Sequence, residues 1–314
     1  MPATKPNVAA LVEQMPDTDS DLLFKQPNEK PSDNPAAPTK PKPKPERLGL
    51  ASKFTGPDPE AAGKIFAEIL SGGRESIVEL VGLVREPGEP DFKSYKAGYV
   101  LHGLVIQAGG TGKEEQRKLL ADTLTSQLGG GKLSQLVKGR IIRELRTLGD
   151  KDAVPTIGKA LLDEDISADA AQALLTIRDG AAPHFRTALE KSQGKNRVSF
   201  IQALGYLRDT ESAPALTKAL GDTDREIRRI AAWALANIGE ASAADALLKS
   251  ADAAEGSERS QATGYCLLLA DRLAALGKKP DAVRVLTHLR DTRKDPAERH
   301  VREAAANALG AIAN

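Results

Sequence analysis

The sequence predicts an all-α protein, an α-solenoid of about six helix pairs that follows a proline-rich arm. Three observations lead to this prediction. A short motif with a proline recurs around Pro155, Pro183 and Pro214, at intervals of 28 and 31 residues. A second, leucine-containing motif alternates with it. Aromatic residues make up only 4% of the chain, which suits a repeat core of alanine and leucine in which helices approach closely.

The proline motif predicts the first helix of each pair. It occurs at 153–161, 181–189 and 212–220, with a degraded copy at 242–248. Proline in the first turn of a helix costs little, because the N–H that it lacks would have no helical partner there. We therefore expect each of these segments to begin a helix at its proline.

The leucine motif predicts the second helix. It consists of a small residue, Leu, two variable positions, Ile or Leu, and a break that ends in Asp, Glu or Asn. Its copies are Glu144–Asp150, Ala173–Asp179, Ala203–Asp209, Ala234–Glu240 and Ala308–Asn314. Apolar residues at helical spacing give each helix one apolar stripe, and a single pair cannot bury it. Stacked pairs can, so the core is predicted to be a continuous ribbon.

These residues resemble the HEAT-like repeats named for phycobilisome lyases. The unit Asp222–Glu240 matches the second-helix pattern of that family at nearly every defined position. The resemblance is strong over 139–250 and 297–314 and looser over 57–138. The resemblance implies a right-handed superhelical stack. It implies nothing about function, because this repeat serves many unrelated functions.

Residues 251–296 depart from the repeat pattern. Within them, Leu267–Gly277 followed by Asp281–Leu286 looks like a tetratricopeptide hairpin. We interpret this stretch as an irregular pair within one solenoid that covers residues 57–314.

Residues 1–56 are predicted to be a disordered Pro/Lys-rich arm, because they hold ten of the 19 prolines and lack apolar periodicity. The segment Lys40–Pro45 predicts a stiff, extended spacer. The apolar patches Val8–Val12 and Leu22–Phe24 are either part of a plain leader or peptide motifs that fold on a partner. Order is expected to begin near Pro59, after a capping residue.

A candidate binding face follows from the resemblance, because second helices line the concave face of such solenoids and that face usually binds. The family's variable positions there correspond to Tyr95, Tyr99, Arg140, Arg143, Gln172, Gln202, Tyr206, Arg229, Trp233, Asn237 and Asn307. Aromatic residues and arginine are enriched at interface hot spots. The alternative is that Trp233 only packs against its neighbours.

One predicted helix is strongly basic, with Arg140, Arg143 and Arg146 close together. An acidic partner is one interpretation of these charges. The favoured one is a solvated face with Arg–Asp pairs between neighbouring repeats, in which Arg228 lies opposite a loop aspartate.

Several chemistries are disfavoured by the residues present. The four histidines, His102, His184, His288 and His300, have no adjacent Glu, so the paired His-Glu motifs of a di-iron HEAT-like hydroxylase are missing. Cys266 lies in an apolar run and is expected to be a buried thiol. The glycines before Lys113 do not match a phosphate-binding loop in spacing.

Composition narrows the choice of function further. A formal net charge of +1 argues against a broadly basic nucleic-acid binder. No apolar stretch is long enough for a membrane span or a signal peptide, so a cytoplasmic location is expected. The sequence thus predicts a non-catalytic scaffold or adaptor, monomeric on its own and without a cofactor or metal. It would bind a protein or peptide on the concave face. The alternatives are a lyase-like or chaperone-like factor acting on a modified protein and, third, a HEAT-like nucleic-acid binder.

Overall fold

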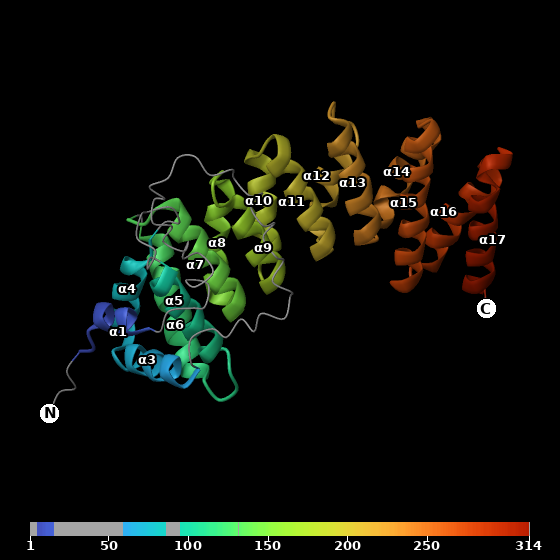
Figure 1. Ribbon diagram of the computed structural model, residues 1–314. Coiled ribbons are helices and arrows are strands. Elements are labelled where there is room, and N and C mark those ends of the chain that lie inside the picture. The colour runs from blue at the N-terminus through green and yellow to red at the C-terminus, as the bar shows by residue number, and fades with distance from the viewer. Residues whose placement is uncertain (1–4, 16–58, 86–94, 131, 314) are drawn as a thin grey trace, which may run out of the picture. The chain divides into compact units, whose positions relative to one another are not determined.

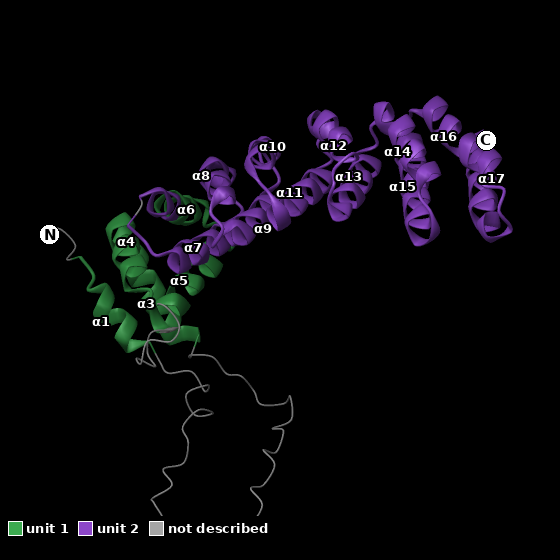
Figure 2. Cartoon of the chain, turned by 90° about the horizontal axis from the view of Figure 1, so that it is seen from above, with its two compact units in different colours: residues 1–123 green, residues 124–314 purple. Residues whose placement is uncertain are grey.

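The computed structural model describes residues 5–15, 59–85, 95–130 and 132–313, and all regular structure within them is helical (Figure 1). Most of the predicted arm, including Lys40–Pro45 and Leu22–Phe24, lies outside the described residues. The chain divides into two compact units, residues 1–123 and 124–314 (Figure 2). The predicted all-α architecture is confirmed for the described residues.

The described residues of the first unit form four helices and the beginning of a fifth. They are α1 (Val8–Gln14), α3 (Pro59–Ser71), α4 (Gly73–Leu83), α5 (Tyr95–Ala108) and α6 (Glu114–Gly129), which continues across the unit boundary. Pro59 occupies the first position of α3, as predicted. The helix buries Phe66 against α5, where a Cβ on Gly103 would lie 2.1 Å from the ring. Glycine at 103 therefore allows α3 and α5 to pack closely.

Helix α1 corrects the prediction that all of residues 1–56 are disordered. Asn7 caps it by accepting a hydrogen bond from the Ala10 amide at 3.0 Å. Val8, Leu11 and Val12 are buried against α3, α4 and α5. Composition predicted disorder because these apolar residues are few. These few apolar residues are enough to stabilise the helix here, because α3, α4 and α5 of the same chain cover them.

The second unit is a row of helix pairs. The first helices are α8 (Val154–Lys159), α10 (Ala182–Lys191), α12 (Ala213–Ala219), α14 (Ala244–Ala253) and α16 (Lys279–Thr292). The second helices are α7 (Gln135–Leu148), α9 (Ser167–Ile177), α11 (Gly194–Leu207), α13 (Arg225–Ile238), α15 (Gly256–Ala275) and α17 (Arg299–Ala313). Among the described residues of this unit, α8/α9, α10/α11, α12/α13, α14/α15 and α16/α17 form five pairs, and α7 precedes them.

First and second helices lie on opposite sides of the second unit (Figure 2). Each first helix from α8 to α16 packs on the second helix that follows it, and the second helices from α7 to α15 pack on their successors. One apolar cluster extends from Ile201 on α11 to Ala305 on α17. The core is therefore continuous from α11 to α17, as stacking of one-sided helices requires.

The breaks after the second helices also follow from local chemistry. Gly149 and Gly239 end α7 and α13 with φ of 68° and 76°, in the left-handed region that glycine adopts freely. Arg178 and Arg208 take this position after α9 and α11, with φ of 66° and 55°. After α7, α11 and α13, the acidic residue that closes the motif then starts a 3-10 turn. Asp150, for example, accepts a hydrogen bond from the Asp152 amide at 2.9 Å.

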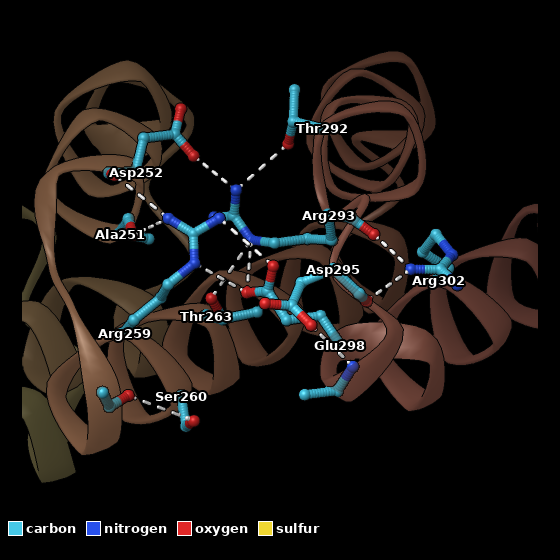
Figure 3. Close-up of polar contacts among 12 residues, drawn as sticks. Ala251, Asp252, Arg259, Ser260, Thr263, Thr292, Arg293, Asp295, Glu298 and Arg302 are labelled. Carbon is cyan, nitrogen blue, oxygen red and sulfur yellow. Dashed lines mark hydrogen bonds and ion pairs between the residues drawn. The ribbon is translucent and has the colours of Figure 1, made fainter.

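The irregular stretch, residues 251–296, contains α15 and α16 and is held by a buried arginine. Arg293, directly after α16, has a side chain that is only 1% exposed and reaches between Asp252 and Glu298 (Figure 3). Its Nη1 donates to Asp252 on α14 at 2.5 Å, and its Nε donates to Thr263 on α15 at 3.4 Å. Glu298, in the turn before α17, also accepts from Arg259 at 2.7 Å. One charge network thus joins four consecutive helices.

We predict that Arg293→Ala lowers the free energy of unfolding by about 2–3 kcal/mol, because the substitution leaves Asp252 and Glu298 without their shared cation. The Asp252 side chain is 39% exposed. Water can therefore solvate it after the substitution, and the expected loss of stability is smaller than for a fully buried ion pair. Urea unfolding followed by far-UV circular dichroism measures it.

Arg290→Ala on the same helix is the matched control. Arg290 pairs with its neighbour Asp291 at the surface, with the two side chains 45% and 56% exposed. An exposed pair contributes little, so this variant is expected to stay within about 0.5 kcal/mol of the parent protein. Equal losses from the two substitutions would contradict a structural role for the buried network.

Candidate functional site

The eleven residues of the predicted concave face, hereafter the candidate face, fall on second helices in the second unit and on α5 in the first. Tyr99 is half-buried on α5. Tyr95 begins that helix, and its side chain lies outside the described residues. The other nine lie on α7, α9, α11, α13 and α17.

An aromatic pair lies at the middle of the candidate face. The rings of Tyr206 on α11 and Trp233 on α13 meet edge to face, with centroids 4.9 Å apart and planes at 68°. This geometry is favourable for aromatic rings. Tyr206 is 49% exposed, whereas Trp233 packs partly into the apolar cluster. Trp233 thus packs against its neighbours and supports an exposed tyrosine, and its part in binding stays a prediction.

Helices α11 and α13 approach each other closely at Gly205, next to this pair. A Cβ on Gly205 would come within 2.7 Å of the Trp233 ring and 2.9 Å of the Ala234 backbone. Asn237, one turn further along α13, donates to the Gly205 carbonyl at 2.9 Å and accepts from Arg272 on α15 at 3.2 Å. Asn237 thus joins three successive second helices. Its polar groups are used within the stack.

Beside the aromatic pair, a groove of about 290 Å³ runs between α9 and α11. Gln172, Gln202 and Tyr206 line it together, along with Ser199 and Leu175. The structure therefore brings these three predicted residues to one place. Arg146 donates to the Gln172 carbonyl oxygen at 3.0 Å, which orients that amide.

The arginines of the candidate face are paired with carboxylates. Arg143 donates to Asp169 on the next second helix at 2.6 Å. Arg229 forms two hydrogen bonds to Glu226 and one of 3.4 Å to the Tyr265 hydroxyl. The hydrogen bond to Glu226 raises the pKa of Arg229, and Arg229 in turn lowers the pKa of Glu226. Arg140 lies 3.9 Å from the buried Glu144.

One expected pairing is wrong in detail. Arg228 does not face a loop aspartate carboxylate; it donates to the backbone carbonyls of Asp222 and Thr223, at 2.9 and 3.0 Å. The Asp222 carboxylate instead pairs with Arg197 of the preceding second helix at 2.8 Å. The Arg–Asp pairs between neighbouring repeats do occur, but other arginines supply them.

The remaining predicted residue, Asn307, is exposed on α17 and lines neither the groove nor the aromatic pair. Three residues of the face were missed by the sequence prediction: Gly205, Tyr265 and Arg272. The repeat register offered no signal for the last two, because they lie in the irregular stretch. Gly205 could have been found as a glycine within a predicted helix, which often marks close packing.

The groups that could carry chemistry were also located. Cys266 is buried, and burial raises the pKa of its thiol to about 12, so it is a poor nucleophile near neutral pH. His288 hydrogen-bonds Asp252 at 2.8 Å, and His184 lies where Gly158 leaves room for its ring. Within the described ranges, no three His, Cys, Asp or Glu side chains are grouped as a metal site would need. None of the described helices is long and apolar enough to cross a membrane.

Comparison with known proteins agrees with this architecture. The family model described as HEAT repeats matches residues 182–267, which comprise α10 to α14 and part of α15. Residues 182–267 thus carry HEAT-like repeats, and the described residues as a whole are all-α. No curated protein sequence matches the chain.

Three solved structures of different kinds are among those similar to this chain. The complex of CpcE and CpcF of phycocyanin lyase from Nostoc sp. PCC7120 is 17% identical over 75% of this chain and 94% of that chain, with a TM-score of 0.37. An engineered protein is 22% identical over 81% and 74%, with a TM-score of 0.38. Human deoxyhypusine hydroxylase is 16% identical over 76% and 96%, with a TM-score of 0.31.

We predict that Gly205→Ala destabilises the second unit by about 1–3 kcal/mol, because the added methyl group must displace Trp233 or the α13 backbone. Trp233 is the only tryptophan in the chain. Its fluorescence therefore reports directly on this contact during thermal unfolding.

Gly264→Ala is the control for this substitution. Gly264 lies within α15, and a Cβ there would have nothing within 4 Å. The change should be neutral or stabilise the helix by up to about 1 kcal/mol. An unchanged emission spectrum and melting temperature in Gly205→Ala would show that α11 and α13 are not held by this close approach.

Proposed function

We propose that the chain is a non-catalytic scaffold or adaptor that binds a peptide segment of another protein on the candidate face. The observation that carries the proposal is the exposed Tyr206 ring, held by Trp233 at the end of the groove between α9 and α11. A rigid, half-exposed aromatic ring beside a hollow is the kind of anchor that dominates protein interfaces.

The lining of the groove favours an uncharged peptide. Its polar groups are the amides of Gln172 and Gln202 and the hydroxyl of Ser199, which can both donate to and accept from a peptide backbone. Ala168, Ala171 and Leu175 supply an apolar floor. A volume of about 290 Å³ suits one or two side chains of a ligand rather than a folded surface.

The electrostatics disfavour the nucleic-acid alternative. Arg143 and Arg229 on this face are hydrogen-bonded to Asp169 and Glu226. Binding of phosphates requires cations that can release counterions, and these two are already neutralised. The lyase-like alternative lacks an available thiol, because Cys266 is buried with a raised pKa.

The proposal is tested with a random peptide library selected on the immobilised full chain. Selected peptides are expected to bind with micromolar affinity in a fluorescence titration. Tyr206→Ala should weaken them roughly 30-fold, the loss typical of a hot-spot residue. Gln202→Ala should weaken them less, because it removes one hydrogen-bonding group.

Val283→Ala provides the matched control. Val283 is an exposed apolar residue, 38% accessible, on the first helix α16, and its removal should leave peptide affinity unchanged. If the selected peptides bind Tyr206→Ala and the parent protein with equal affinity, their site lies elsewhere and the proposal is overturned. So would a saturating selection that returns no binder.

A further inference from the structure

Helix α1 occupies the first unit in the manner of a bound peptide. Val8, Leu11, Val12 and Met15 are spaced at i, i+3, i+4 and i+7, and each is at most 7% exposed. This spacing is typical of an amphipathic helix that docks its apolar face into a groove. The groove is formed by α3, α4 and α5, each of which contacts α1 (Figure 2).

Polar contacts fix the direction of α1 in this groove. At its C-terminal end, the ammonium group of Lys96, a buried residue on α5, donates to the Met15 carbonyl at 2.7 Å. A cation is favourable there because it faces the negative end of the helix. At the other end, Lys5 lies 3.5 Å from both Glu75 and Glu79 on α4. The groove thus binds three features of the segment in chain order. Glu75 and Glu79 bind the ammonium group of Lys5, the apolar surface covers the helix, and Lys96 binds the carbonyl group that follows it.

The fit is close where the chain enters the groove. A Cβ on Gly72 would lie 2.6 Å from the ring of Pro6, so only glycine leaves room for it. A helix of seven residues is not stable in water by itself. The groove therefore provides most of the stability of α1, as a receptor does for a peptide that folds on binding.

Residues 16–58 separate α1 from α3 in the sequence. Because α1 and the groove belong to one chain, their contact is intramolecular, and it is favoured over the same contact between two separate molecules. A separate molecule with the same pattern can compete for the site, because nothing but the tether distinguishes it from α1.

We infer that the groove between α3, α4 and α5 is a second binding site, independent of the candidate face, for a short amphipathic helix of a partner protein. That helix carries apolar anchors at i, i+3, i+4 and i+7 and a basic residue before its first turn. Helix α1 is the internal occupant of the site, and the partner helix displaces it. The site therefore couples binding to release of the N-terminal segment.

The test uses a fluorescein-labelled peptide with the sequence of residues 5–15 and the full chain, with fluorescence anisotropy as the readout. The substitution Leu11→Asp in the full chain places a charge on a buried anchor and vacates the groove. Labelled peptide is expected to bind this variant at least tenfold more tightly than the parent chain. A peptide with the same Leu→Asp change should bind neither protein.

A second route vacates the groove without altering α1 or the groove. A protease site inserted between residues 16 and 58 allows the N-terminal segment to be cut and removed by dilution, and thermal melts establish that the protein remains folded. The cut chain should bind the peptide as tightly as the Leu11→Asp variant does. Absence of binding to the cut chain, or equal affinity for the cut and parent chains, would overturn the inference.

Discussion

The fold depends on how closely neighbouring second helices approach one another. Each helix has a single apolar stripe, and the stripe is removed from water only by the helices on either side. The approach of α11 to α13 is possible because Gly205 has no side chain at the point where Trp233 and Ala234 cross it. Between α7 and α9 the constraint is weaker, because a Cβ on Gly139 would come closest to the Asp169 carboxylate, at 2.8 Å, and that side chain can move.

This constraint also determines what remains for binding. Asn237 and Arg143 lie on the candidate face, yet their polar groups hold successive second helices together. Tyr206 is different, because its ring rests on Trp233 and still leaves about half of its surface to solvent. The proposed binding site is therefore centred on Tyr206 and the adjoining groove, whereas Asn237 and Arg143 stabilise the stack.

Much of this fold was predictable from the sequence, because each repeat carries its own start and stop signals. Pro183 and Pro214 begin first helices, and Gly149 and Gly239 end second helices. What could not be predicted depends on contacts between segments distant in sequence. Helix α1 has too few apolar residues to be recognised without the groove, and the burial of Arg293 requires carboxylates from other helices. The partner of Arg228 was mistaken because a repeat pattern gives the neighbourhood of a side chain and not its hydrogen bonds.

Native-state hydrogen exchange of the full chain tests the central claim, that neighbouring second helices share one cooperative core. Amides in the middle of α11 and α13 should exchange with a common opening free energy and the same dependence on denaturant, as members of one unfolding unit do. In Gly205→Ala, both sets should lose protection together, while amides of α3 and α5 in the first unit keep theirs. Loss of protection confined to α11, with α13 unaffected, would show that the helices are stabilised separately and would contradict the account.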